Sequence, residues 1–411
     1  MPASEVQETA AREVRLRTRN LLLAAAFSRA LATGLIGVLL GIYLAQLKLD
    51  PRQIGAVISF ALAGGALAAL LVTVFGSRFR PRPMLVTLCA LATLGGTAAI
   101  FTDSFQLLAA AGFAGMFNAM GRDRGALPII EQALLPAMAG ETSRTSVFAW
   151  YNALLDAGYA CGGLLAGLPT LLQAAGFGAV DAFKVTLAVY AALYALSTVL
   201  YALLPPVADA VKSVSLRALP ADSRRIVWKI SFLFFIDAFG GGFLGSALLS
   251  YFFFERFAAS EAIIAVLFFV GRGLSAASHL AAAWLAKRIG LIRTMVFTHV
   301  PSSLLLITVG LTPDFGVAAL LFLLREALNE MDVPTRQSYV MAVVRPEERL
   351  AAAGITSLVR VAGWAAAPAI AGVLMSTGGL AAPLFVGAAL KISYDILLWR
   401  DFSKVKAPEE R

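Results

Sequence analysis

Charged side chains lie inside stretches of this chain that are otherwise apolar. An unpaired charge at the centre of a lipid bilayer costs about 2.5–3.5 kcal/mol on insertion scales, so such residues face a polar cavity or an ion-pair partner. They therefore mark either a route for polar solutes and ions or structural ion pairs that hold helices together. The mid-segment residues are Arg29, Asp156, Asp237, Arg272, Arg325, Glu326, Arg360 and Lys391.

Further charges are concentrated in two runs, GRDRGALPIIEQ at 121–132 and REALNEMDVPTRQ at 325–337. Each run contains a proline, which removes a helical hydrogen bond, and glycines weaken the first run further. A broken apolar helix with charges is a favoured place for a solute or ion site. Counted along the helix, Glu131 and Arg336 fall near one membrane surface, which predicts a gate, unless these residues are simply solvated there. The gate candidates are Arg122, Asp123, Arg124, Glu131, Glu330, Asp332 and Arg336.

Helical spacing groups some of these charges. Residues 325, 329, 332 and 336 share one helical stripe, with Glu326 and Glu330 on a second stripe beside it. Lys391 and Asp395 are four residues apart and are expected to pair locally. His279 and His299 are single histidines, and the sequence assigns neither a role.

The elements that must position these residues are membrane helices. The chain has 411 residues, of which 59% are hydrophobic and 14% are charged, and its mean hydropathy is +0.79. A soluble protein carries about 25% charged residues, so the surrounding solvent is lipid. The net charge of +9 does not indicate nucleic-acid binding, because the basic residues recur between apolar runs and form no single patch.

Twelve apolar segments have the length of about 20 residues that a membrane span needs. The fold class expected is therefore an all-α integral membrane protein. The predicted spans are 20–46, 54–76, 83–102, 105–133, 146–172, 179–204, 230–254, 261–286, 294–312, 315–344, 351–375 and 381–399.

Lys and Arg are distributed unevenly between the two sides of these spans. One side receives 22 of them and the other receives only Lys48, Arg52 and Arg256. The positive-inside rule predicts that the basic side, and with it both termini, lies on the cytoplasmic side of the inner membrane. A cleaved signal peptide is the rival interpretation of the N-terminus, but the apolar stretch after Arg29 runs on to Leu47, which is too long.

The chain also resembles itself. Arg29 aligns with Asp237, which lies 208 residues further on, and the same shift aligns Gly34 with Gly242 and Tyr43 with Tyr251. Two related membrane halves are typical of transporters. The predicted domains are a cytoplasmic segment 1–19, a six-helix bundle 20–204, a cytoplasmic linker 205–229, a second six-helix bundle 230–400 and a cytoplasmic tail 401–411.

Twelve spans in two related halves resemble the major facilitator superfamily over residues 20–400. Thr73–Arg82 (TVFGSRFRPR) and Ala283–Arg293 (AWLAKRIGLIR) are similar to the loop motif of that family, although Ser77 and Lys287 occupy its aspartate positions. The small residues at 158–167 and 363–372 are similar to the span-five motif of its exporters, and ordinary tight packing explains them equally well.

The resemblance implies that the first and seventh spans flank a central cavity as symmetry mates. Arg29 and Asp237 would then approach each other across the transport pathway, or form a permanent brace. The candidates for binding the solute or coupling its movement to an ion are Arg29, Asp237, Asp156, Arg325, Glu326, Arg360 and Lys391.

The function expected is secondary transport of a small solute by alternating access, most simply proton-coupled antiport with export. Alternatives are a passive facilitator or uptake symporter of the same fold, and a carrier-like membrane sensor or enzyme. Neither a phosphate-binding loop nor a metal-ligand cluster is present in the sequence, so no enzyme activity, cofactor or metal is expected. Nine basic and eight acidic residues lie in the membrane core, a near balance that favours neither an anion nor a cation. The expected partners are the solute, protons and lipid, with the protein a monomer.

Overall fold

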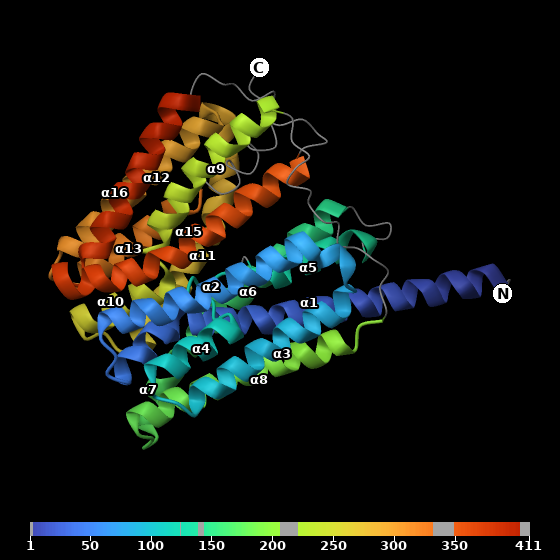
Figure 1. The fold of residues 1–411 in the computed structure, drawn as a ribbon, viewed down its shortest axis with the longest axis horizontal. Coiled ribbons are helices and arrows are strands. Elements are labelled where there is room, and N and C mark those ends of the chain that lie inside the picture. The colour runs from blue at the N-terminus through green and yellow to red at the C-terminus, as the bar shows by residue number, and fades with distance from the viewer. Residues whose placement is uncertain (1–2, 124, 139–143, 206–220, 332–348, 403–411) are drawn as a thin grey trace.

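The computed structural model describes residues 3–123, 125–138, 144–205, 221–331 and 349–402, and all regular structure in them is helical (Figure 1). The first half contains α1 (Ala3–Gln46), α2 (Pro51–Phe75), the short 3-10 turn η1 (Gly76–Arg78), α3 (Pro81–Ile100), α4 (Phe105–Gly115), α5 (Ala126–Met138), α6 (Arg144–Leu165), α7 (Leu168–Ala174) and α8 (Ala179–Ala202). The second half contains α9 (Ala221–Gly242), α10 (Ser246–Phe257), α11 (Glu261–Ile289), α12 (Leu291–Leu311), α13 (Phe315–Asn329), α15 (Arg349–Gly378) and α16 (Ala382–Phe402).

The helices follow the predicted spans. Among the described residues, ten helices are long and apolar enough to cross a membrane, and Phe105–Gly115 and Ala126–Leu135 are shorter apolar helices. Three predicted spans are each divided into two helices, α4/α5, α6/α7 and α9/α10. The tenth span begins as α13 and continues into residues outside the described part. The all-α membrane fold predicted from hydropathy is therefore confirmed.

Local capping explains why several helices begin where they do. Asp50 precedes α2, and its carboxylate accepts a hydrogen bond from the backbone N–H of Gln53 at 2.9 Å, while the Gln53 side chain accepts one from the Asp50 N–H at 3.1 Å. Pro51 occupies the first helical position, where its missing N–H costs nothing. Asp314 caps α13 in the same way, through the N–H of Val317 at 2.8 Å. These caps let long apolar helices turn back within a few residues.

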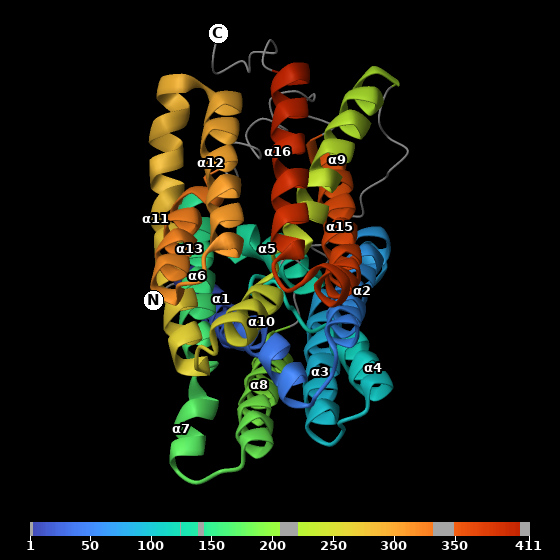
Figure 2. The same cartoon turned by 90° about the vertical axis from the view of Figure 1, so that its left-hand side faces the viewer.

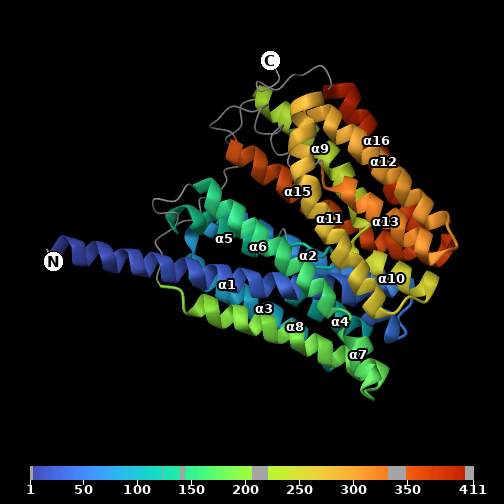
Figure 3. The same cartoon turned by 180° about the vertical axis from the view of Figure 1, so that it is seen from behind.

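The two halves form separate bundles that meet at one end. Figures 1 and 3 show α1–α8 in one bundle and α9–α16 in the other, and the bundles diverge towards the side on which both chain ends lie. Figure 2 shows α10 beside α1, and α15 beside α2, where the bundles converge. The closed end therefore consists of the C-terminal part of α1, the start of α2, α10, the start of α11 and the end of α15.

Glycines allow the halves to approach closely at this end. A Cβ atom on Gly55 of α2 would lie 2.2 Å from the carbonyl oxygen of Pro368 in α15, and one on Gly372 of α15 would lie 2.2 Å from that of Pro51. A Cβ on Gly41 of α1 would lie 2.0 Å from the Ala247 carbonyl of α10. Backbone-to-backbone contact across the interface is possible only because these three residues have no side chain.

A few hydrogen bonds also cross the closed end. Arg52 donates to the Ser376 hydroxyl at 2.8 Å, and the Ser59 hydroxyl accepts from the Ala369 N–H at 2.8 Å. Thr170 donates to Glu261 at 2.8 Å, at the junction of α7 and α11. The closed end thus combines tight packing with isolated polar contacts and has no continuous charge network among the described residues.

The close approach at Gly55 predicts a difference between two glycines of the same helix. Gly55→Ala should destabilise the protein by about 1–3 kcal/mol, because the added methyl group forces α2 and α15 apart. Gly65→Ala is the matched control, since a Cβ there meets nothing within 4 Å and alanine favours the helix. Thermal unfolding of the detergent-purified protein should show a lower midpoint only for Gly55→Ala. Equal midpoints for the two variants would contradict the packing described here.

Candidate functional site

A cavity lies between the halves, and both bundles line it. It contains about 1450 Å³ of space between side chains, part of it open to solvent. Its apolar lining includes residues of α2, α3, α5, α10, α11, α13 and α15. This combination of apolar walls with a few convergent polar groups is typical of a small-molecule site. The charged residues that line it are Arg122, Asp123, Asp237, Arg272, Arg325, Glu326, Glu330, Arg360 and Lys391.

The interrupted fourth span forms one wall of this cavity. α4 ends at Gly115, Met116 adopts a left-handed conformation with φ 52°, and Gly121 has φ 69°. The backbone stays non-helical until α5 begins at Ala126, so Pro128 falls in the first turn of α5, where proline is tolerated. The predicted break in this span is confirmed, and it lies before the proline.

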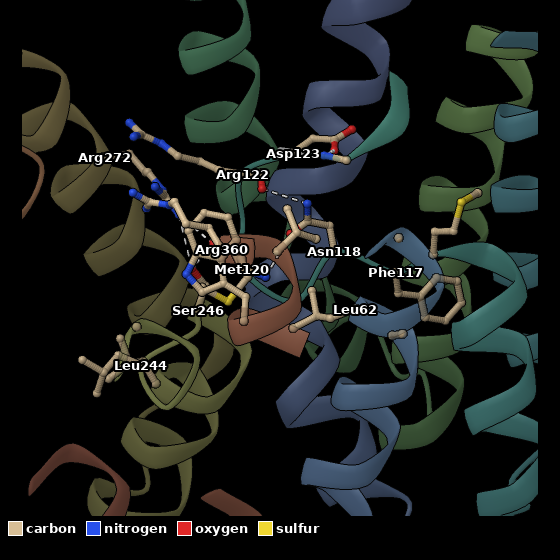
Figure 4. A pocket seen from close by; sticks show the side chains of 18 of the residues that line it. Leu62, Phe117, Asn118, Met120, Arg122, Asp123, Leu244, Ser246, Arg272 and Arg360 are labelled. Carbon is tan, nitrogen blue, oxygen red and sulfur yellow. Dashed lines mark hydrogen bonds between the residues drawn. The ribbon is translucent and has the colours of Figure 1, made fainter. Parts of the chain in front are cut away.

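The other half satisfies the backbone groups that this break leaves unpaired. The Ala119 carbonyl accepts from the Ala247 N–H at 3.0 Å, and the Met120 carbonyl accepts from the Ser246 hydroxyl at 3.0 Å. Arg272 donates to the same Met120 carbonyl at 3.2 Å (Figure 4). Irregular backbone at membrane depth is tolerated where protein or a cavity surrounds it, and both conditions hold here.

Arg122, which lies within this break, connects the two halves. Its guanidinium pairs with Glu330 of the second half at 2.8 Å and with Asp156 of α6 at 3.3 Å. Figure 4 shows the Arg122 side chain projecting towards Arg272, and the Asn118 side chain donates to the Arg122 carbonyl at 2.8 Å. The Arg122–Glu330 pair is therefore an ion pair between the bundles at the cavity.

A buried ion cluster, which we call the α1 cluster, consists of Arg29, Asp123, Glu131, Tyr151 and Tyr201. Arg29 is fully buried and binds Glu131 through two nitrogens, at 3.1 and 2.8 Å, and Asp123 through a third. The hydroxyls of Tyr151 and Tyr201 donate to the two oxygens of Glu131. All of these contacts lie within the first half, and the cluster braces α1, α5, α6 and α8.

A second cluster, which we call the α12 cluster, lies in the other half. Lys391 of α16 donates to Asp237 of α9 at 3.3 Å and lies 2.9 Å from Nε2 of His299 in α12. Nδ1 of His299 lies 3.0 Å from the carboxylate of Asp395. The nitrogen Nη2 of Arg360 is 3.7 Å from Asp237. The chain of contacts therefore runs from the cavity, at Asp237 and Lys391, to the fully buried Asp395.

The sequence of this chain is similar to that of a known family of membrane proteins. A family model described as Major Facilitator Superfamily matches residues 22–327, well over half of the chain. The chain belongs to the major facilitator superfamily. It is therefore a multi-pass membrane transporter of small solutes and not an enzyme, as the sequence predicted.

Other similarities fit this assignment. An uncharacterized membrane protein of Saccharomyces cerevisiae, YJR124C, is 23% identical over 417 aligned residues, which cover 93% of each chain. Among solved structures, the nucleoside transporter NupG has a TM-score of 0.72 at 15% identity and covers 96% of this chain and 100% of its own. A D-xylose–proton symporter has a TM-score of 0.70 at 14% identity, covering 97% and 98%. At these identities the solved structures show the fold alone.

Arg29 and Asp237 are not brought together in this superfamily member, which corrects the expectation that they approach across the pathway. Arg29 does not line the cavity and is bound to carboxylates of its own half, whereas Asp237 lines the cavity and binds Lys391. Two carboxylates of the fourth span lie within reach of Arg29, so its charge is compensated without the second half. Glu131 is likewise fully buried in the α1 cluster. Its role in a gate stays a prediction.

The tenth span follows its predicted stripe as far as the structure describes it. Arg325 donates to Asn329 at 3.1 Å and pairs with Glu326, which also accepts from the Ser275 hydroxyl at 3.1 Å. Asp332 and Arg336, with Arg124 of the fourth span, lie outside the described residues.

Sequence reasoning missed His299. The expected local pair of Lys391 and Asp395 is replaced by an arrangement in which the His299 imidazole lies between the two side chains. A histidine within a membrane span is a functional candidate by default, and that signal was available from the sequence. What the sequence could not show is that α12 places the ring against α16.

The α1 cluster predicts a large stability effect. Arg29→Ala leaves Glu131 buried without its cation, and breaking a buried pair in this way costs about 3–5 kcal/mol. Arg225→Ala, at an exposed position of α9, is the control and should change the unfolding free energy by less than about 0.5 kcal/mol. Denaturant or thermal unfolding of the two purified variants measures the difference. Equal stability would show that the cluster is not a brace.

Proposed function

We propose that this chain is a proton-coupled antiporter that exports a small solute. The observation that carries the proposal is the α12 cluster, in which an aspartate and a lysine at the cavity contact a buried histidine–aspartate pair. Solute in the cavity can reach Asp237 and Lys391 directly, and His299 and Asp395, which lie behind them, can hold a proton.

The chemistry of the imidazole ring links the two events. Nδ1 of His299 lies 3.0 Å from the carboxylate of Asp395, and we assign the tautomer in which Nδ1 carries the proton and donates it to this carboxylate. Nε2 then has a lone pair and accepts from the Lys391 ammonium at 2.9 Å. Only one proton fits between Nζ of Lys391 and Nε2 of His299. A proton can therefore be added at Nε2 only when Lys391 moves away or gives up its own proton.

A change at Lys391 also changes its contact with Asp237. When solute attracts Lys391 or Arg360, Asp237 loses cationic partners and its carboxylate is more readily protonated. When solute leaves, the ion pair re-forms and favours the ionised carboxylate. Exchange of solute against proton at this cluster is the coupling that antiport needs, with Asp156 and Glu326 as further acids near the cavity.

Alternating access supplies the movement. The bundles are packed together at one end and diverge at the end where α1 begins and α16 ends. We propose that this open end lies on the cytoplasmic side of the inner membrane. Rocking the halves about the central contacts would close this end and break the hydrogen bonds at the other. Export is favoured by the small residues at 158–167 and 363–372, where Gly162 of α6 packs against the backbone of Leu31.

The coupling proposal is tested by transport in reconstituted vesicles. A panel of toxic compounds and nutrients first identifies a transported solute. Its flux should rise when the compartment that receives the solute is made more acidic than the compartment that it leaves. Asp237→Asn and His299→Gln should each reduce this response at least tenfold. Asp314→Asn, at an exposed helix cap, is the matched control and should keep it.

Other outcomes would decide between the alternatives. Flux that ignores an imposed pH gradient would identify a passive facilitator, and solute that moves with the proton would identify a symporter. An unchanged response in Asp237→Asn would remove Asp237 as the coupling acid.

The orientation is tested separately. In a variant whose native cysteines Cys89 and Cys161 are replaced by serine, Glu255→Cys should react with a membrane-impermeant maleimide in intact cells. Arg225→Cys should react only after lysis, because it lies with the termini. The reverse labelling pattern would invert the proposed topology.

A further inference from the structure

Arg272 differs from the other cations of the cavity. It lies on α11 and lines the cavity, and its Nη2 donates to the Met120 carbonyl at 3.2 Å and to the Ser246 hydroxyl at 3.3 Å. Both acceptors are neutral, and Arg272 forms no ion pair with any carboxylate of the described residues. Its full positive charge therefore faces the cavity with only dipolar partners.

Each of the other cavity cations has an acidic partner. Arg122 pairs with Asp156 and Glu330, and Arg325 pairs with Glu326. Lys391 and Arg360 share Asp237. The acids that could attract Arg272 from a distance, namely Asp156, Glu326 and Glu330, are thus already bound to other guanidinium groups.

A second guanidinium lies next to Arg272. Arg122 is close enough for their like charges to repel, and Figure 4 shows the two side chains projecting into the same part of the cavity. Arg122 is already bound to Asp156 and Glu330, so Arg272 is the one of the two that has no carboxylate beside it among the described residues. An uncompensated charge at membrane depth is costly, and the planar guanidinium of Arg272 presents a fork of N–H donors to the cavity. A carboxylate, sulfonate or phosphate monoester offers the two oxygens that such a fork binds.

The fourth span adds to the positive electrostatic potential around Arg272. Ala126 and Leu127 line the cavity and form the first turn of α5, so the N-terminal end of this 13-residue helix faces the cavity. Unpaired N–H groups and the helix dipole at this end favour an anion. The carboxylate of Asp123 accepts from the Gly125 N–H just before this helix and already occupies part of this end, while Arg29 compensates its charge.

The rest of the wall around Arg272 is apolar. Phe268 lies one turn before Arg272 on α11, and Phe322, Leu244 and Leu249 line the cavity with it. These side chains fit an aromatic or aliphatic body rather than a heavily hydroxylated one.

We propose that Arg272, with Arg122 beside it, binds the anionic group of the transported solute, and that the solutes are small organic anions with an apolar body. This assignment rests on the proposed transport function but not on its coupling to protons. Arg272 acts in recognition, whereas the α12 cluster carries the proton, and the two lie on different helices of the second half.

The test is equilibrium binding to the full-length protein in detergent, measured by calorimetry without any membrane gradient. The probes are two matched sets of an anion, its amide and its amine. The aromatic set is benzoate, benzamide and benzylamine, and the aliphatic set is hexanoate, hexanamide and hexylamine. In the wild-type protein at least one anion should bind at least tenfold more tightly than its amide and its amine. Arg272→Gln should abolish that preference, Arg272→Lys should retain part of it, and Arg225→Gln should leave it unchanged.

The outcomes separate this proposal from proton coupling. If no anion is preferred over its amide in the wild-type protein, or if Arg272→Gln keeps the preference with an unchanged unfolding temperature, the assignment is wrong. If Arg272→Gln unfolds, Arg272→Lys decides, because a lysine preserves the charge and must weaken the preference without removing it. Flux that ignores a pH gradient while Arg272→Gln loses anion binding would overturn the coupling proposal alone.

Discussion

A charge in an apolar interior needs an opposite charge, and this requirement organises the protein. Arg29 sits in the middle of the first helix with no exposed surface, so two carboxylates of the fourth span must lie against it. One of those carboxylates, Asp123, belongs to the interruption between α4 and α5, and the other, Glu131, belongs to α5. The interruption in turn frees backbone carbonyls that the second half satisfies. One buried guanidinium thus holds both sides of the interruption, and the interrupted segment lines the cavity.

The two halves solve the same problem differently. The α1 cluster is closed, with tyrosine hydroxyls completing the shell around Glu131, and it has the properties of a brace. The α12 cluster begins at the cavity wall and ends at a buried carboxylate, with a histidine between them. Aligned positions in the repeat therefore carry different environments. The repeat aligns Arg29 with Asp237, but Arg29 binds carboxylates of the first half, whereas Asp237 binds cations of the second half.

Much of the fold could be predicted from the sequence. Hydropathy located the apolar helices of the described residues, since lipid imposes a minimum apolar length. The interruption of the fourth span was predicted from Pro128 and the glycines before it, but the break contains Gly121 and Gly125 while Pro128 lies within α5. The pairing of the charges could not be predicted, because spacing along a helix shows which residues share a face and not which helix lies opposite. Lys391 and Asp395 share a face of α16, yet each contacts His299 of α12. Nothing in the spacing of α16 reveals that a third side chain separates them.

The closed end of the interface has an energetic consequence. Its polar contacts include hydrogen bonds between Arg52 and Ser376, Ser59 and Ala369, Thr170 and Glu261, and Ser250 and the Val38 carbonyl. Each is worth about 0.5–1.5 kcal/mol net, and water can replace it when the halves separate. The contacts of Ala119 and Met120 with α10 lie beside the cavity instead. These hydrogen bonds therefore resist separation of the halves only weakly, and the close packing at Gly41, Gly55 and Gly372 supplies the main resistance. If the halves rock as proposed, a ligand must favour one state by enough free energy to offset the loss of this packing.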